Sequence, residues 1–342
     1  MPLASGWGSR SFFKLGYGTM PELPKVVYFG ADAICLPGLR YLAESGSALC
    51  QLVGVVSQPD RRQGRGRQLQ ANPVAEYARS CGIPLLQPEK PDAALGAWLR
   101  QAGVRVAFVM AYGHFLPKVV REAAQHGSLN FHGSILPAYR GASPVETAIA
   151  MGELETGVCL MQMVKEMDAG GVADCERVRI ESTDTAVEVR AKVGAAVVPL
   201  LQRNLSILLT GGLDFVPQEA SRASYCRKIS KEDGALNFGS PAATLAARLR
   251  AFTPWPGGYF DHGPTRIKVG HCTVAASLEV AEPGQVLTVG ATLDVATADG
   301  VLQIHELQRP GGRMLPVADF VRGYPIEVGE VLPYVETSPL LV

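Results

Sequence analysis

Apolar runs and stretches of helical pattern alternate along the first two thirds of the chain. The apolar runs, rich in Val, Ile, Leu and Phe, lie at residues 26–30, 51–57, 83–86, 104–111, 128–133 and 157–164. Stretches with the pattern or the end signals of helices lie at residues 36–45, 72–82, 92–102, 117–125 and 144–151. Nearly continuous apolar strands separated by helices are typical of a parallel sheet that is covered on both faces. We therefore expect a doubly wound, Rossmann-like α/β domain over residues 24–212.

The pattern changes after residue 212. Residues 213–224 contain Pro and Ser without a clear period, which predicts a linker. A helix is expected over residues 240–252, with Ser240 and Pro241 at its start, and short alternating strands with turn signals follow it. These features predict a small, OB-like β-barrel over residues 225–342.

Composition and charge narrow the class of protein. The 342 residues suffice for about two domains, and 47% of them are apolar, as in globular proteins. Lys and Arg number 32, as do Asp and Glu, which excludes a uniformly basic nucleic-acid binder but not a local basic patch. The seven scattered cysteines contain no CxxC pair and predict no disulfide framework and a reducing, cytoplasmic compartment. No histidine has the spacing of a metal ligand, and no apolar run approaches the roughly 20 residues of a membrane span, so neither a metal nor a membrane is expected.

The first 23 residues are left out of the predicted fold. Residues 1–20 contain Arg10 and Lys14 but no acidic residue, a composition that a transit peptide shares. We favour a start assigned too early, with Met20 as the natural first residue. Residues 1–23 are accordingly expected to be a disordered or mis-assigned leader, and the sequence does not decide between Met1 and Met20.

The end of the apolar run at residues 128–133 is the first candidate for chemistry. Alternate residues of a strand share a face, so Asn130 and His132 project together, with Ser134 next in that register. An amide can donate to a developing oxyanion and an imidazole exchanges a proton near neutral pH, which suits acyl transfer. Asp168, in a glycine-containing loop after the run at 157–164, is placed to orient His132 or to take a proton. The residues alone leave open a plainer interpretation, in which these side chains cap a polar strand end and form a turn.

The start of the helix expected over residues 144–151 has a recognisable pattern. Ser143 and Glu146 have the spacing of a capping box, and Pro144 falls at the first helical position. This pattern predicts a helix that begins here and turns its backbone N–H groups toward the preceding loop.

A second candidate is the glycine-containing basic segment at residues 58–73. Arg61, Arg62, Arg65 and Arg67 fall within seven residues, with no acidic residue after Asp60. Arginine binds phosphate oxygens bidentately and glycine permits close approach, so the segment suits a nucleic-acid backbone. It lacks the GK[ST] of a P-loop and the GxGxxG fingerprint. A solvated surface loop is the alternative.

Six segments together resemble the methionyl-tRNA formyltransferase family from about residue 25 to near the C-terminus. Residues 130–145 read NFHGSILPAYRGASPV, similar to the family pattern NVHxSLLPxxRGAAPI, and residues 155–163 read ETGVCLMQM, similar to ETGVTIMQM. The other matching segments are QPDRRQGRGRQL at 58–69, AYGHFLP at 111–117, YCRKISKE at 225–232 and RAFTPWP at 250–256. Several specific motifs in the right order favour the functional interpretations over the plainer ones.

The resemblance implies a reaction and a set of roles. The formyl donor is expected to be 10-formyltetrahydrofolate, the acceptor initiator Met-tRNA, and no metal takes part. The implied catalytic residues are Asn130, His132 and Asp168. Folate contacts are implied for Ser134, Ile135, Leu136, Pro137 and Tyr112. The arginine-rich segment, with Arg61, Arg62, Arg65 and Arg67, is expected to contact the tRNA acceptor stem, the C-terminal barrel is a second tRNA surface, and a monomer is expected.

Three departures from the family pattern and several rival functions remain. Gly171 stands where the family has a second acid, Thr253 replaces the usual Asn, and residues 1–20 have no counterpart. One alternative is a formyltransferase that acts on a small amine, such as a nucleotide-linked amino sugar. Another is a non-catalytic RNA-binding module built on an inactive enzyme. A nicotinamide dehydrogenase is disfavoured because no glycine fingerprint follows the first strand.

Overall fold

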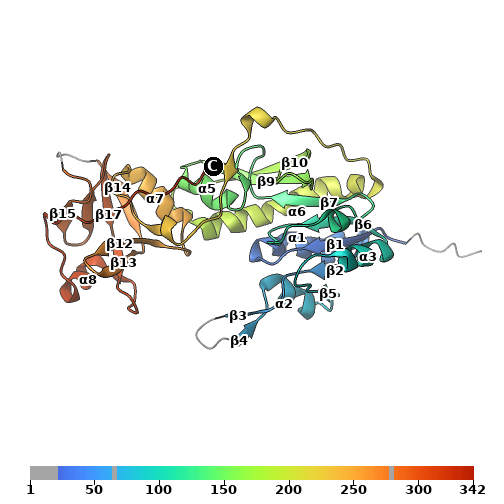
Figure 1. The fold of residues 1–342 in the computed structure, drawn as a ribbon, viewed down its shortest axis with the longest axis horizontal. Coiled ribbons are helices and arrows are strands. Elements are labelled where there is room, and N and C mark those ends of the chain that lie inside the picture. Colours follow the sequence, from blue (N-terminus) through green and yellow to red (C-terminus); the bar gives the residue numbers. More distant parts are fainter. Residues whose placement is uncertain (1–21, 64–67, 277–280) are drawn as a thin grey trace, which may run out of the picture.

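The computed structural model describes residues 22–63, 68–276 and 281–342, and a seven-stranded sheet dominates the first part of the chain (Figure 1). Its order is β10-β9-β7-β6-β1-β2-β5. The strands are β1 (Lys25–Phe29), β2 (Gln51–Val56), β5 (Leu85–Leu86), β6 (Val104–Val109), β7 (Ser128–His132), β9 (Glu155–Gln162) and β10 (Val172–Arg179). The five strands from β7 to β5 are parallel, whereas β9 and β10 run antiparallel to their neighbours. The predicted doubly wound sheet is confirmed, with an antiparallel edge that the apolar pattern does not indicate.

Helices cover both faces of this sheet. They are α1 (Leu36–Ala43), α2 (Pro73–Ser80), α3 (Ala93–Gln101), α4 (Lys118–Arg121), α5 (Pro144–Ala150) and α6 (Ala186–Thr210), with short 3-10 turns at Ala33–Cys35, Ser45–Ala48, Ala220–Arg222 and Glu232–Gly234. One face packs on α1, α2, α5 and α6 around Phe108 and Phe131. The other packs on α3 and α4 around Val27, Phe29 and Val109.

Helix α6 corrects the expectation that no segment is apolar enough to span a membrane. By length and composition alone it meets that requirement, with a mean hydropathy of 1.4 over its most apolar window. Its side chains instead lie in the core, where Val193, Val197 and Leu201 are completely or almost completely buried. The helix begins with a capping box formed by Thr185 and Glu188. A core helix satisfies the same criterion as a membrane span because both are apolar around most of their circumference.

The capping box predicted at α5 is wrong, although the helix begins at Pro144 as expected. Ser143 makes no side-chain cap bond, and its hydroxyl oxygen accepts a hydrogen bond from the Ile229 N–H at 3.3 Å. Glu146 pairs with Arg190 of α6 at 2.8 Å. Both side chains are therefore taken by tertiary partners that the local pattern cannot reveal.

The arginine-rich segment contains a pair of short strands, which we call the hairpin. Strands β3 (Arg61–Gln63) and β4 (Gln68–Gln70) pair antiparallel, and the hairpin projects away from the sheet on the same side as the C-terminal domain (Figure 1). Arg61 and Arg62 are exposed on β3. Arg65 and Arg67 lie outside the described residues.

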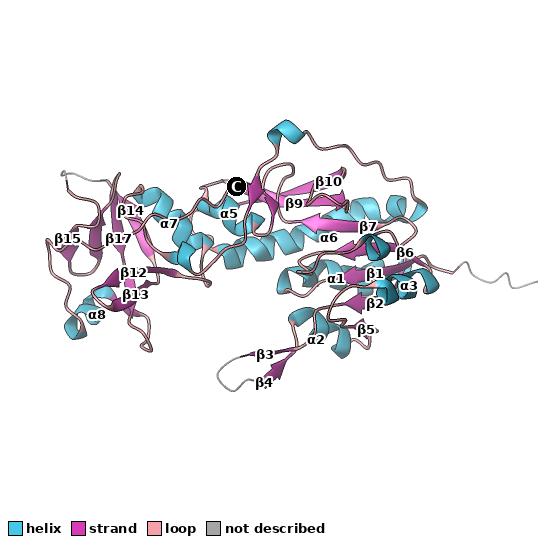
Figure 2. Ribbon diagram, in the orientation of Figure 1, coloured by secondary structure: helices cyan, strands magenta, loops and turns pink. Residues whose placement is uncertain are grey.

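The C-terminal part is built of antiparallel strands around its own core (Figure 2). One sheet has the order β12-β13-β18-β19 and the other β14-β17-β16-β15, and the inner faces share a core that includes Phe238, Phe260 and Leu302. The strands are β12 (Gly258–His262), β13 (Thr265–Val269), β14 (Cys272–Ala275), β15 (Val286–Val289), β16 (Leu293–Ala296), β17 (Val301–Ile304), β18 (Glu306–Gln308) and β19 (Leu315–Pro316). Two helices, α7 (Ala242–Ala251) and α8 (Val317–Gly323), complete it. The strands expected for a small barrel are thus present.

The two parts are joined twice, by the linker and by the C-terminal tail. Strand β11 (Tyr225–Cys226) pairs parallel with β8 (Arg140–Gly141), and Cys226 in turn bridges to Leu341. Leu340 is buried in the core of the first domain. The tail therefore returns to the sheet domain after the chain has completed the C-terminal strands.

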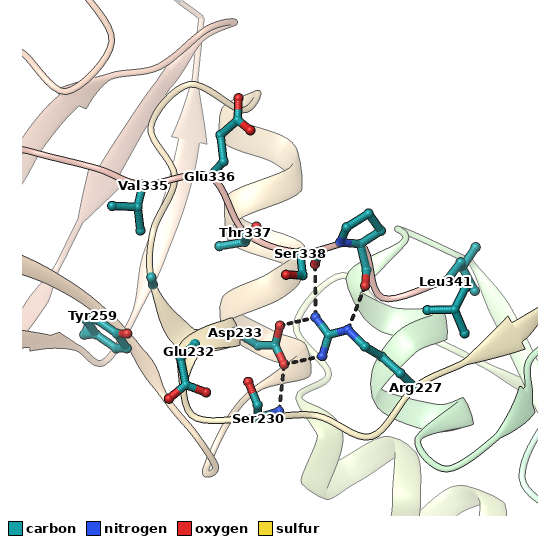
Figure 3. A pocket seen from close by; sticks show the side chains of 13 residues that line it. Arg227, Ser230, Glu232, Asp233, Tyr259, Val335, Glu336, Thr337, Ser338 and Leu341 are labelled. Carbon is teal, nitrogen blue, oxygen red and sulfur yellow. Dashed lines mark hydrogen bonds and ion pairs between the residues drawn. The ribbon is translucent and has the colours of Figure 1, made fainter.

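Arg227 fastens this tail (Figure 3). Its guanidinium donates to both carboxylate oxygens of Asp233, at 2.8 and 2.5 Å, and to the backbone oxygens of Ser338 and Pro339. A cavity of about 490 Å³ opens beside this ion pair, between the segment at residues 227–235 and the tail. Burial opposes ionisation of Asp233, but the bonds from Arg227 and the Ser230 N–H hold the pKa of its carboxyl below the usual range.

We expect Asp233→Asn to lower the free energy of unfolding by about 2 kcal/mol at pH 7, because a hydrogen-bonded charge pair is lost. A carboxyl whose pKa is lower in the folded state stabilises the fold above its ordinary pKa, and this contribution disappears as the pH falls through the folded value. The difference between the two proteins should therefore shrink below pH 4. Urea unfolding from pH 7 to pH 3 measures it.

Asp261→Asn provides the matched control, since Asp261 pairs with Arg266 on an exposed surface. Its effect should stay below about 1 kcal/mol. A stability difference for Asp233→Asn that is constant across this pH range would contradict the role given to the Arg227 pair.

Candidate active site

The predicted catalytic residues of β7 lie on the sheet face that is covered by α3 and α4. Asn130 is paired with Val109 and Met161, and His132 with Cys159, so these side chains share one face. The alternate residue Phe131 points into the core beneath α6. His132 is only 5% exposed, whereas Asn130 is half-buried. Both stand at the carboxyl edge of the parallel strands, where open α/β sheets form their sites.

The structure brings Asp168 to His132, as predicted. Its carboxylate lies 3.6 Å from His132 Nδ1 and accepts a hydrogen bond of 2.9 Å from the Gly141 N–H. Asp168 has a φ of +49°, in the left-handed region that side chains other than glycine rarely adopt. Among the described non-glycine residues, only Ala111 and Tyr139 share this property, and both belong to segments at the site. Such conformations cluster where the surrounding structure fixes a functional geometry.

The hydrogen bonds of His132 define what its two ring nitrogens can do. Nε2 lies 2.9 Å from the Tyr139 carbonyl oxygen, which can only accept, so Nε2 carries a proton in the neutral ring. Nδ1, which faces Asp168, is then the nitrogen that gains or loses a proton. The pair can therefore hold one exchangeable proton between an imidazole nitrogen and a carboxylate, which is the requirement for general acid–base chemistry.

The segment implied for folate binding supplies apolar surface beside this pair. Leu136 clusters with Cys159 and Met161, and Ile135 and Val172 pack against them. Gly157 makes this possible, because a Cβ there would lie 2.4 Å from Ile135 Cδ1. Pro137 is half-buried in the same segment.

The side chains of Ser134 and Tyr112 are both buried inside the protein. Ser134 is completely buried, and its hydroxyl donates to the Ala138 carbonyl at 2.6 Å. Tyr112 lies in the core on the His132 face, edge-to-face with Phe29 at 5.4 Å, and burial raises its pKa to about 12. Its hydroxyl has no hydrogen-bond partner in the part of the chain that the structure describes. At both positions the hydroxyl group is thus buried in the protein interior.

The structure contradicts the expectation of no disulfide. Cys159 of β9 and Cys175 of β10 stand directly opposite in the ladder and form a disulfide. Cys159 Sγ also accepts a hydrogen bond from the Leu136 N–H at 3.4 Å. Two cysteines separated by 16 residues become neighbours only through the register of an antiparallel edge strand, which the sequence interpretation did not include.

Gly171, which departs from the family pattern, has a packing explanation. A Cβ at this position would lie 2.9 Å from the Phe215 Cβ. The neighbouring Gly170 is tighter still, since a Cβ there would lie 1.9 Å from the Gln162 carbonyl oxygen. The loop that carries Asp168 therefore passes too close to its surroundings for a side chain at either glycine.

Two features that the sequence interpretation missed complete the surroundings of Asp168. Arg140 is 4% exposed and donates to the Gln218 amide oxygen, and the Gln218 amide nitrogen donates to the backbone oxygens of Asp168 and Gly170. Arg140 lay inside a recognised motif, but Gln218 lies in the linker and carried no local signal. Over the described ranges, no group of three or more His, Cys, Asp or Glu side chains is placed to hold a metal ion.

Comparisons with known proteins show the family of this chain. A formyl transferase family model matches residues 26–204, and a model of the formyl transferase C-terminal domain matches residues 228–325. A methionyl-tRNA formyltransferase of Sorangium cellulosum is 39% identical over 90% of this chain and 99% of its own length. One from Thermus thermophilus is 41% identical over 89% and 98%. The chain therefore belongs to the formyl transferase family, in which these relatives of matching length are methionyl-tRNA formyltransferases.

Solved structures share the fold at lower identity. An N-formyltransferase from Helicobacter canadensis, in complex with folinic acid and dTDP-3-aminofucose, aligns with a TM-score of 0.60 and 18% identity over 84% of this chain and 99% of its own. HypX from Aquifex aeolicus, in complex with tetrahydrofolic acid, aligns with a TM-score of 0.56 and 15% identity over 91% of this chain and 51% of its own. Both alignments show a shared fold.

We expect a thiol titration of the denatured, unreduced protein to find five free thiols out of the seven cysteines. Reduction before denaturation should raise the count to seven, because it opens the Cys159–Cys175 bond. In Cys175→Ser all six remaining cysteines should react without reduction. Seven free thiols in the unreduced protein would contradict the disulfide.

Proposed function

We propose that this chain transfers the formyl group of 10-formyltetrahydrofolate to the α-amine of methionine on initiator tRNA. The observation that carries the proposal is the constellation of Asn130, His132 and Asp168 at the carboxyl edge of the sheet, with the Asp168 carboxylate 3.6 Å from the His132 ring. It occurs in a chain whose relatives over nearly their full length are methionyl-tRNA formyltransferases.

The acceptor amine needs positioning more than activation. An α-amine titrates near pH 8, and esterification of the carboxyl lowers that value, so much of it is neutral at pH 7. Its nitrogen attacks the formyl carbon, and the carbonyl oxygen becomes an oxyanion. The bond from the formyl carbon to N10 of the folate then breaks, N10 takes up a proton, and the amine loses one.

Three side chains divide this work. The Asn130 amide donates to the oxyanion, and the His132 ring stabilises the same charge once it has taken up the amine proton at Nδ1. Asp168 holds the ring at Nδ1 and relays the proton that leaves the amine. The proton resides on the His132–Asp168 pair between its departure from the amine and its delivery to N10.

The folate binds against the apolar cluster of Ile135, Leu136 and Met161 on the His132 face. Pro137, which is half-buried, follows directly in the same segment. The buried hydroxyl of Ser134 fixes the turn that presents this segment, and Tyr112 packs in the core on the same face of the sheet. No metal is required, because side chains carry every proton and charge in this scheme.

The tRNA is bound by the hairpin and by the second domain. Arg61 and Arg62 are exposed on β3, and the hairpin, the C-terminal domain and the carboxyl edge of the sheet lie on one side of the molecule (Figure 1).

Within this proposal, residues 24–212 form the catalytic domain, 213–224 the linker and 225–342 the tRNA-binding domain. The protein acts as a cytoplasmic monomer without membrane contact.

The direct test is formyl transfer to methionyl initiator tRNA, with methionyl elongator tRNA and an amino-sugar nucleotide in parallel. Formylation of the initiator tRNA alone supports the proposal. Formylation of the sugar amine alone would replace it with the small-amine alternative. Folate binding without transfer to any acceptor would indicate an inactive enzyme.

We expect Asn130→Ala to lower kcat by roughly 10²–10³-fold, because one donor to the oxyanion is removed. KM for folate should change little, since the contact strengthens only in the transition state. Steady-state kinetics with both substrates varied measures the two effects. A loss of less than tenfold would contradict the oxyanion role of Asn130.

The double variant Arg61→Ala, Arg62→Ala should raise KM for tRNA and leave KM for folate unchanged. Each lost phosphate contact reduces the slope of log affinity against log salt by about one. Arg100→Ala is the matched control, because Arg100 is exposed on α3, away from the hairpin. Equal weakening toward tRNA and folate would count against an RNA contact by the hairpin.

A further inference from the structure

We infer that Gln218 is a positioning residue for the formyl transfer, and that through it the linker between the domains holds Asp168 in place. The inference rests on the proposed role of Asp168 and extends it to a residue 50 positions further along the chain. Gln218 is half-buried and lies in the linker that the sequence predicts at 213–224.

The contacts of Gln218 reach the loop of Asp168 directly. Its amide nitrogen donates to the Asp168 carbonyl at 2.8 Å and to the Gly170 carbonyl at 2.7 Å. Both protons of one amide are therefore used on a single short loop. They restrain the backbone on either side of Ala169, while the Gly141 N–H restrains the Asp168 carboxylate from the opposite end at 2.9 Å.

The loop needs such restraint because its conformation is unfavourable by itself. Asp168 occupies the left-handed region at a φ of +49°, which residues other than glycine adopt only when the surrounding structure holds them there. The loop also passes so close to Gln162 that a Cβ on Gly170 would lie 1.9 Å from the Gln162 carbonyl oxygen. If the hydrogen bonds from Gln218 are lost, the loop can relax and carry the carboxylate away from His132.

Arg140 fixes which way the Gln218 amide points. The Nε and Nη2 atoms of Arg140 donate to the Gln218 amide oxygen at 3.1 and 2.8 Å, while Nη1 donates to the Tyr225 hydroxyl at 2.9 Å. Because arginine can only donate, the amide oxygen must face it, and the amide nitrogen must face the loop. The Arg140 guanidinium also lies over the Tyr225 ring, 5.6 Å from its centroid.

This arrangement requires a glutamine and not a glutamate. A side chain at position 218 must accept from a guanidinium at one end and donate to two carbonyls at the other. A glutamate satisfies the first requirement and keeps Arg140 paired, but its second oxygen would face the carbonyl oxygens of Asp168 and Gly170. The substitution thus separates the effect on the Asp168 loop from any effect on Arg140.

The experiment compares Gln218→Glu with the wild type and with Glu219→Gln. Glu219 is the exposed neighbour whose carboxylate contacts only Ser221 and Arg222 in the described chain, so the control makes the reverse change one residue away. We expect kcat for Gln218→Glu to fall by about ten- to a hundredfold, because a small displacement of a catalytic group has that cost. KM for tRNA and for folate should stay within about twofold of wild type, as should all constants of Glu219→Gln.

A double-mutant cycle with Asp168→Ala tests whether Gln218 acts through Asp168. Single-turnover rates with excess enzyme are measured for both single variants and for the double variant. If Gln218 only positions Asp168, the double variant should be no slower than Asp168→Ala, because residues that act as a unit are not additive. Multiplying effects would overturn the inference, as would a raised KM with unchanged kcat or an unchanged kcat for Gln218→Glu.

The cycle also separates this inference from the proposed function. If Asp168→Ala retains wild-type activity, the catalytic role of Asp168 fails, and the inference fails with it. If Asp168→Ala is inactive but Gln218→Glu is not impaired, only the positioning role is wrong. Thermal unfolding of each variant, with midpoints near that of the wild type, confirms that the rates compare folded enzymes.

Discussion

The hydrogen bond from the Gly141 N–H to the Asp168 carboxylate is the contact on which the site depends. It joins the loop after β9 to the segment that follows β7, and thereby brings Asp168, which is 27 residues from Gly141 in the chain, to the His132 ring. Gly141 can make it because its φ of +113° is available only to glycine, and because a Cβ would lie 2.2 Å from the Cys226 carbonyl oxygen. The loop of Asp168, the segment at Gly141 and the strand at Cys226 therefore come close together at this hydrogen bond.

That close approach ties catalysis to the connection between the domains. Strand β11, directly after the linker, pairs with β8, and the C-terminal tail pairs with β11 through Leu341. Cys226 of β11 therefore lies between the last residues of the chain and Gly141, which holds Asp168. Gln218 adds a second path from the linker to the same loop. A site assembled in this way is complete only when the second domain has folded back on the first.

The departures from the family pattern follow the packing around the site. Gly171 has no room for an acidic side chain beside Phe215. Cys159 takes the place of a family threonine and forms a disulfide with Cys175 next to the apolar cluster of Leu136. Thr253, at the position of the usual asparagine, donates its hydroxyl to the Leu249 carbonyl at the end of α7.

The sequence by itself determined the class of fold, the strands β1, β2, β5, β6, β7 and β9 with the helices α1 to α5, and the candidate pair Asn130 and His132. These follow from the spacing of apolar residues and from the alternation of side chains along one strand, which are local properties. Asp168 was a candidate from its place after the apolar run at 157–164, and motif resemblance favoured the catalytic interpretation of all three residues. Only the tertiary structure decided the antiparallel edge, the disulfide, the inward hydroxyl of Ser134 and the role of Gln218. Each of these depends on how segments far apart in the chain are aligned or packed against one another. A local sequence pattern does not specify which distant segments meet.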